Sequence, residues 1–256
     1  MTILEDKVRD GDPDRYAATL AAPEIARDRL WPLYAFNLEI SRAPWVTREP
    51  MIAEMRLQFW TDTLDEISTG AAPRAHDVAQ PLAKLWTTAK LPVSVGHAMI
   101  EARRWDIYRT PFSDENELLD HLNATSGNLM WLAAMALGAA PEAEPCVRSM
   151  GIASGLANWL RAVPELELRG CPALPDKSGA AIAALATRGL SLHARSRASR
   201  TCLTAAAHPA LLAGWQTRAV LKLAEKDPAT VREGRLQQSE FRRRGGLLLH
   251  ALRKSW

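Results

Sequence analysis

The stretch Asn158-Trp-Leu-Arg-Ala-Val-Pro-Glu-Leu-Glu-Leu-Arg-Gly170 decides how this chain is interpreted. Its proline at position 164 predicts a helix over 142–162 that passes into a polar loop over 163–177, because the residue before a proline disfavours helical backbone. Two glutamates and two arginines lie within a few residues of that boundary. Such a cluster is either a site where carboxylates hold a metal ion and an anionic substrate, or only the end of a helix.

Around this stretch the sequence is typical of an all-α protein. Strand signals are scarce, and apolar residues recur at helical spacing. In the segment 49–68 the residues near one stripe predict a buried face: Met51, Met55, Phe59, Leu64 and Ile67. The other expected helices are 24–42, with a kink at Pro32, then 77–90, 92–108, 113–137, 142–162, 178–206, 209–226 and 239–253. Long helices with short connections predict one domain over 1–256.

Composition and cysteine usage indicate a soluble protein of a reducing compartment. The chain is 47% hydrophobic and 24% charged, and its three cysteines are widely spaced, which argues against a disulfide framework. The N-terminal residues lack the basic-then-apolar order of a signal peptide. The longest apolar run, 129–140, has 12 residues and is too short to cross a bilayer. We therefore expect a cytoplasmic protein, with membrane contact only at its surface.

Charge is distributed unevenly along the chain. Residues 1–185 carry 18 Lys+Arg against 25 Asp+Glu, whereas residues 186–256 carry 14 against 4. A basic third suits nucleic acid, anionic lipid or an acidic partner. We favour solvated arginine-bearing helices and predict no nucleic-acid partner. The basic segment 239–256 also contains leucines, which predicts either contact with an anionic membrane or, preferably, a helix packed on the core.

Few residues form an unambiguous catalytic or metal-binding pattern. The six histidines are scattered, with no pair at i, i+3 or i, i+4, so no histidine metal site is expected. Asp62 and Glu66 are spaced i, i+4 and could bind Mg²⁺, but a solvated helix face is favoured. The spacing Gly151-x-x-x-Gly155 predicts close helix packing, and the tryptophans at helical positions predict core or cavity lining.

Two sets of motifs resemble the squalene/phytoene synthase family. The first comprises Leu33-Tyr-Ala-Phe36, Met55-Arg-Leu-Gln-Phe-Trp60 and Leu64-Asp-Glu-Ile67. The second comprises Gly151-x-Ala through Asn158-Trp-Leu-Arg161, then Arg169-Gly170 and Leu174-Pro175, and Arg104-Trp-Asp-Ile-Tyr108 lies between the sets. The resemblance implies an all-α isoprenoid-synthase-like helical bundle around a central cavity.

Active members of that family condense two prenyl diphosphates head to head. They use two motifs with aspartates at i and i+4, which hold Mg²⁺ against the diphosphate. Magnesium prefers oxygen ligands, and it neutralises charge on the departing group. Here the expected aspartates fall on Ser41, Arg42 and Trp45 in the first motif, and on Ala162 and Leu166 in the second. The resemblance therefore implies that both metal clamps are missing.

The sequence resembles even more closely a branch of this family that lacks the acidic motifs. Ala35-Phe-Asn-Leu-Glu-Ile40, the Arg-Leu-Gln-Phe-Trp run and Leu160-Arg-Ala-x-Pro164 resemble that branch, which includes mitochondrial assembly factors for respiratory complex I. The similarity implies a non-catalytic scaffold or assembly factor for a respiratory membrane complex, peripheral at the inner membrane. Two alternatives stay open. One is an active Mg²⁺-dependent prenyltransferase, and the other is a module that binds a prenyl lipid without chemistry.

The candidate substrate-binding residues are positions that the resemblance places around the cavity. They are Tyr34, Asn37, Glu39, Arg161 and Glu165. No catalytic residue, metal ligand or resident cofactor is expected, and Mg²⁺ is expected only if the prenyltransferase alternative holds. In that case Asp62, Glu66 and Asp106 are the candidate substitute ligands, and Arg161 is the group that meets a diphosphate.

Overall fold

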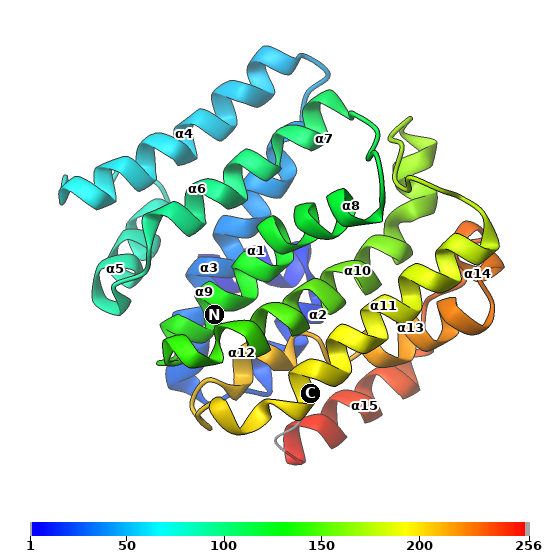
Figure 1. Cartoon of the computed structure of the whole chain (residues 1–256). Helices are drawn as coiled ribbons and strands as arrows, with labels where there is room; N and C mark the ends of the chain where they lie inside the picture. The colour runs from blue at the N-terminus through cyan, green and yellow to red at the C-terminus, as the bar shows by residue number, and fades with distance from the viewer. Residues whose placement is uncertain (1, 254–256) are drawn as a thin grey trace.

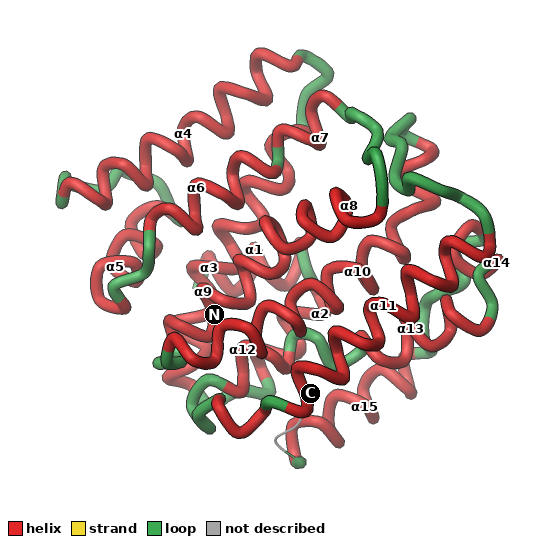
Figure 2. Tube along the Cα trace, viewed as in Figure 1, coloured by secondary structure: helices red, strands yellow, loops and turns green. Residues whose placement is uncertain are grey.

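A computed structural model describes residues 2–253, and within that range the chain forms helices and loops without any strand (Figure 2). The helices are α1 (Ile3–Gly11), α2 (Pro13–Leu20), α3 (Glu24–Arg42), α4 (Pro50–Thr69), α5 (Ala79–Ala89), α6 (Val93–Ala102), α7 (Arg104–Tyr108), α8 (Glu115–Leu122), α9 (Asn128–Ala136), α10 (Glu144–Leu168), α11 (Gly179–Ala198), α12 (His208–Leu212), α13 (Thr217–Lys226), α14 (Ala229–Arg232) and α15 (Glu240–Leu252). A π-helical turn, η2 (Asn123–Gly127), joins α8 to α9. Short 3-10 turns are η1 (Ala43–Trp45), η3 (Pro141–Ala143) and η4 (Arg200–Cys202). The all-α prediction is confirmed.

Helix α10 joins the two hydrophobic clusters that form most of the core. Its first half belongs to a cluster with α3, α4, α5, α6 and α9. There Phe36 meets Trp60 and Trp86 edge-on, with ring centroids 5.4 and 6.1 Å apart. Its second half belongs to a cluster with α8, α11, α13 and α14. Figure 1 shows α10 running through the middle of the molecule, beside α11.

For helix α4 the predicted end is confirmed, whereas the predicted buried face is partly wrong. It begins at Pro50, whose missing N–H costs nothing in a first turn, and it is followed by Gly70 at φ +71°, as the sequence predicts. The predicted buried stripe is wrong at its start, because Met51 and Met55 are 76% and 67% exposed. The side chains that α4 buries are Ala53, Leu57, Trp60, Thr63 and Leu64.

Several predicted boundaries differ from the structure. Helix α10 continues through Pro164 to Leu168, so the predicted loop at 163–177 begins later. The segment 113–137 is divided by η2, and the segment 92–108 is divided near Arg103. Residues 3–20 form α1 and α2, which the sequence analysis did not predict.

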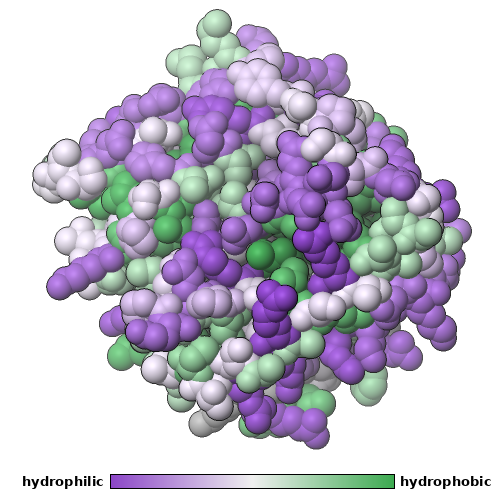
Figure 3. Space-filling view, in the orientation of Figure 1, coloured by the Kyte–Doolittle hydropathy of each residue, from purple (hydrophilic) through white to green (hydrophobic). Residues whose placement is uncertain are grey.

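The C-terminal helix α15 lies on the surface. Leu247 and Ala251 pack against Leu212 and Trp215, while Phe241 is 88% exposed and Leu248 and Leu252 also face outward. The packing prediction for the leucines therefore holds only in part. Within residues 2–253, no helix combines the length and apolarity required to span a membrane. Figure 3 shows one face of the molecule as mostly hydrophilic, with hydrophobic side chains in separate patches.

Candidate functional site

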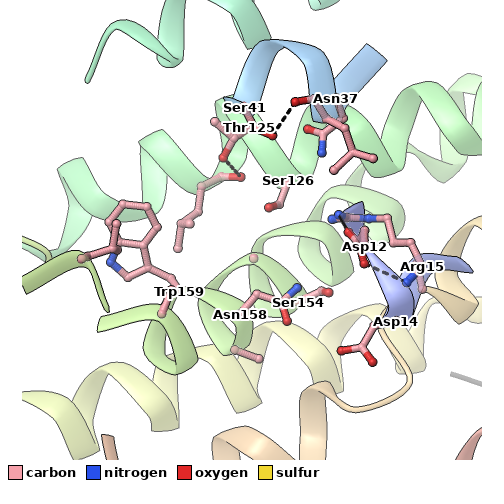
Figure 4. A pocket seen from close by; sticks show the side chains of 18 of the residues that line it. Asp12, Asp14, Arg15, Asn37, Ser41, Thr125, Ser126, Ser154, Asn158 and Trp159 are labelled. Atoms are coloured by element: carbon pink, nitrogen blue, oxygen red, sulfur yellow. Dashed lines mark hydrogen bonds and ion pairs between the residues drawn. The ribbon is translucent and has the colours of Figure 1, made fainter. Parts of the chain in front are cut away.

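A cavity of about 490 Å³ lies between α2, α3, η2, α10 and the start of α13. Its lining is rich in short polar side chains. In Figure 4, Asn37 and Ser41 of α3 lie opposite Ser154 and Asn158 of α10, and Asp12 just before α2 lies at one side. A cavity of this kind, enclosed by helices and lined by convergent polar groups, is the default site for a small molecule.

Two glycines on α10 bring that helix close to the polar turn η2. A Cβ atom on Gly151 would lie 2.8 Å from the Cα of Gly127, and one on Gly155 would lie 2.7 Å from the Cβ of Ser126. Both contacts are too short for a side chain larger than hydrogen. The glycine spacing therefore permits close packing, as predicted, and places Ser126 at the cavity wall.

The positions to which the resemblance assigns aspartates come together in this cavity. Ser41 of α3 and Trp45 of η1 line it from one side, and Ala162 and Leu166 of α10 line it from the other. The fifth position, Arg42, is exposed and is not part of the lining. The lining positions thus carry a hydroxyl, an indole and two aliphatic side chains.

Each carboxylate that lines the cavity has an arginine partner. The four carboxylates make five ion pairs: Asp12 with Arg15, Asp14 with Arg161 and Arg243 at 3.0 and 2.5 Å, Asp106 with Arg103 at 3.5 Å, and Glu165 with Arg169 at 2.6 Å. A guanidinium presents several fixed N–H donors to carboxylate oxygens. Both oxygens of Asp12 and of Asp14 are therefore engaged within the protein, whereas Glu165 and Asp106 each engage one.

Burial and pairing shift the pKa values of two of these acids in opposite directions. Burial raises the pKa of Asp106, and this effect exceeds the opposing influence of Arg103 and Arg109. Burial also acts to raise the pKa of Asp14, but the hydrogen bonds from Arg161 and Arg243 outweigh it, so the pKa is lowered. Asp14 is thus held as a carboxylate between two cations, while burial favours the neutral form of Asp106.

His121 lies in an aromatic wall of the cavity that the sequence did not reveal. Its ring centroid is 5.4 Å from that of Trp159, 5.5 Å from Trp105 and 5.6 Å from Phe112. Burial lowers the pKa of His121 to about 3, with a smaller effect of Arg103. Its Nε2 atom is buried without a hydrogen-bond partner among the described residues. His121 belongs to α8, but Trp105 comes from α7 and Trp159 from α10, so tertiary contacts create its environment and no local pattern indicates it.

The predicted candidate residues fall into two groups. Asn37 and Glu165 line the cavity, although Glu165 is largely exposed and paired with Arg169. Tyr34 lies outside that lining and is buried, with the Cζ of Arg15 5.7 Å from its ring centroid. Burial raises the pKa of Tyr34 to about 12.

Glu39 and Arg161 are held by other partners. The Nζ of Lys7 lies 2.8 Å from Glu39, and Arg161 bonds Asp14. Neither residue belongs to the cavity lining. Arg161 therefore does not line the cavity itself but positions Asp14, which does.

The candidate substitute ligands are dispersed. Asp62 and Glu66 both pair with Arg74, at 3.2 and 2.8 Å, and neither lines the cavity. Asp106 does line it, but it is paired with Arg103. The structure does not bring these three acids together.

Comparisons with known proteins identify the family and the fold. The sequence profile of the family described as squalene/phytoene synthase matches residues 8–178. This chain belongs to the squalene/phytoene synthase family. A dehydrosqualene synthase solved in complex with a ligand has the same fold, with a TM-score of 0.81, 17% identity, and coverage of 96% of this chain and 93% of that one. The squalene synthase HpnC from Alicyclobacillus acidocaldarius gives a TM-score of 0.72 at 17% identity, covering 91% and 93%.

The curated proteins similar to this chain include two kinds. The Drosophila melanogaster homolog of complex I assembly factor 6 is 31% identical over 173 residues, which cover 64% of this chain and 51% of that protein. The human assembly factor 6 is 27% identical, covering 61% and 47%. Phytoene synthase 1 from Zea mays is 26% identical over 185 residues, covering 69% and 43%. The chain spans about half the length of the curated relatives it matches.

Proposed function

We propose that this protein is a non-catalytic member of its family that serves in the assembly of a respiratory membrane complex. The proposal rests on the identity of the side chains that line the cavity. Ser41, Trp45, Ala162 and Leu166 stand where the family resemblance assigns aspartates, and the remaining lining carboxylates are paired with arginines.

This set of side chains does not fit a magnesium–diphosphate cluster. Magnesium bound to a substrate phosphate also needs free carboxylate oxygens at close range. Within residues 2–253, no three or more His, Cys, Asp or Glu side chains gather closely enough to share a metal ion. If one of these carboxylates left its arginine to bind a metal ion, the partly buried guanidinium would be unpaired, which would destabilise the protein.

Relatives that are named as assembly factors support the assembly role. Proteins named as complex I assembly factor 6 or its homolog, from Drosophila melanogaster and human, match this chain over more than 160 residues. One fold hosts many functions, so the cavity chemistry has to agree with the analogy. It does agree, because a scaffold has no need of metal ligands.

A direct assay tests the absence of catalysis. Purified protein is incubated with farnesyl or geranylgeranyl diphosphate and Mg²⁺, with a phytoene synthase as the positive control, and released pyrophosphate is measured. We expect no release above the buffer level. Turnover that a chelator abolishes would overturn the non-catalytic proposal.

A genetic experiment tests the assembly role. The gene is deleted, and NADH:quinone oxidoreductase activity and the level of assembled complex are measured in membranes. Both are expected to fall, and both wild-type protein and Glu165→Gln are expected to restore them, because an exposed cavity carboxylate has no chemical role in a scaffold. An unchanged level of complex after deletion counts against assembly, whereas rescue by the wild type alone argues for chemistry in the cavity.

Peripheral contact at the inner membrane through α15 is part of the same proposal. Phe241, Leu248 and Leu252 face outward on this helix, and Arg242 and Arg244 flank them. An apolar stripe bordered by arginines suits the surface of an anionic bilayer. Sedimentation with vesicles tests this contact: Phe241→Asp is expected to abolish binding, and unchanged binding would exclude α15 as the contact.

A further inference from the structure

Two cysteine side chains meet between the start of α10 and the turn that follows α11. Cys146 lies in the first turn of α10 and is 2% exposed. Cys202 ends the 3-10 turn η4 and packs against the hydrophobic cluster that contains Cys146. The two thiols are hydrogen-bonding neighbours, and neither is part of a disulfide in this structure. The fold thus brings together two thiols that are far apart in the sequence.

The end of α11 and the residues after it orient both thiols. The Sγ of Cys146 donates to the carbonyl oxygen of Ser196 at 3.2 Å, in buried surroundings. The Sγ of Cys202 donates to the carbonyl oxygen of Ser199 at 2.7 Å, in an exposed position. The backbone N–H of Ser199 donates to the same Ser196 oxygen that Cys146 uses. One short turn therefore holds one thiol inside the core and the other near the surface.

The two thiols differ in their access to a dissolved oxidant. Cys202 is half-buried and follows the exposed residues Arg200 and Thr201. Cys146 is enclosed, and burial raises the pKa of its thiol. Because the thiolate is the nucleophile, a buried thiol with a raised pKa reacts slowly on its own. An oxidant therefore meets Cys202 first, and Cys146 is the thiol beside it.

The third cysteine is too distant to compete for this pairing. Cys171 follows the opposite end of α10, and the helix rises about 33 Å between Cys146 and Leu168. A disulfide bond requires Cα atoms within about 7 Å of one another. Within one chain, an oxidised Cys202 therefore has Cys146 and not Cys171 as its partner.

We propose that Cys202 and Cys146 form a reversible disulfide bond when hydrogen peroxide oxidises the protein. The Cys202 thiolate attacks one peroxide oxygen, the O–O bond breaks, and the departing hydroxide takes up a proton to give water. The Cys146 sulfur then attacks the sulfur of the sulfenic acid, the S–O bond breaks, and a second water leaves with the thiol proton of Cys146. Two electrons thus pass from the two thiols to one peroxide. A dithiol reductant restores both thiols by exchange.

A pair of this kind suits a reducing compartment, where disulfides are transient and sense oxidants. The bond also affects the central cavity. The segment after η4 continues through α12 to Ala213, Gly214 and Gln216, which line that cavity together with side chains of α10. Because the disulfide ties η4 to α10, oxidation restricts the motion of this part of the cavity wall. The inference holds whether or not the cavity is catalytic.

Peptide mapping of the full chain tests the pairing. Reduced protein is treated with a slight excess of hydrogen peroxide, unfolded in urea, alkylated and digested with trypsin without a reductant. We expect the intact chain to carry one alkyl group instead of three, and peptide 110–148 to be joined to peptide 201–218. Dithiothreitol is expected to reverse both changes. Before unfolding, hydrogen exchange is expected to be slower in residues 203–217 of the oxidised protein and unchanged in α4.

Single substitutions separate the roles of the two thiols. Cys202→Ala is expected to leave Cys146 reduced, because the buried thiol does not meet the oxidant. Cys146→Ala is expected to accumulate a sulfenic acid on Cys202, which dimedone traps. The matched control is Cys171→Ala, which removes the buried cysteine outside the pair and is expected to be oxidised like the wild type. The wild-type peptide map tests the pairing even if a substitution disturbs folding.

Three results would overturn the proposal. The first is a wild-type chain that still carries three alkyl groups after treatment with peroxide. The second is a Cys202 that ends as a sulfinic acid, or in a disulfide with Cys171 or with a second chain, in place of the bond to Cys146. The third is oxidation of Cys146 in Cys202→Ala to the same extent as in the wild type, which would show that Cys146 meets the oxidant directly.

Discussion

Lowering the pH from 7 to 5 is expected to destabilise the fold through His121. The folded chain holds this imidazole neutral, with its pKa lowered to about 3 by burial and by Arg103. In the unfolded chain a histidine titrates near 6.5. Between these values the unfolded state binds the additional proton, so stability is present above the unfolded pKa and is lost as the pH falls.

The size of the effect follows from the two pKa values. Linkage between 6.5 and about 3 gives a loss of about 2 kcal/mol between pH 7 and pH 5. For a chain of this length, that loss corresponds to a decrease in melting temperature of about 4–8 °C. Urea unfolding at both pH values measures it, with constant m-values as the check on two-state behaviour.

Two variants isolate His121 from the other titrating groups. His121→Phe keeps a ring among Trp105, Phe112 and Trp159, and His121→Gln removes the imidazole without adding apolar surface. Both are expected to lose about 2 kcal/mol less than the wild type over the same pH interval. Equal losses in wild type and both variants would refute the reasoning, because the buried neutral imidazole would then contribute nothing.

Three further changes test the packing and the helix ends. Gly151→Ala is expected to cost about 1–3 kcal/mol in unfolding free energy, because its Cβ would meet backbone atoms of η2; Gly179→Ala, which has space, is the control and is expected to cost nothing. Arg243→Ala is expected to cost about 1 kcal/mol or less and to speed amide hydrogen exchange in α15 but not in α10; equal exchange in α15 would contradict the role of Asp14 as its anchor. Gly70→Ala is expected to cost about 1 kcal/mol, since its φ of +71° strains a Cβ, and unchanged stability would contradict that strain.

Helical periodicity predicted the long helices but not their interruptions. The bounds of α3 were predicted to the residue, and α4 was displaced by one residue. The predicted end of α10 at residue 162 is wrong, because a proline such as Pro164 indicates a helix end only from local sequence. The helix continues since Val163 is buried beside it and Glu165 pairs with Arg169 across the next turn.

The candidate site was predictable where it depends on motif positions and not where it depends on tertiary pairing. Asn37 and Glu165 do line the cavity, and so do Ser41, Trp45, Ala162 and Leu166. The partners of Glu39 and Arg161 were not predicted, because Lys7 and Asp14 belong to α1 and α2, which no helical pattern indicated.

The two ion pairs of Asp14 can form only at different stages of synthesis. This carboxylate lies near the N-terminus, yet one of its two cationic partners, Arg243, follows 229 residues later. During synthesis, α2 and α10 can meet through Arg161 while α15 has not yet been made. The cavity wall at Asp14 therefore gains its second cation only after α15 has been synthesised, so a chain truncated before α15 lacks the ion pair between Asp14 and Arg243.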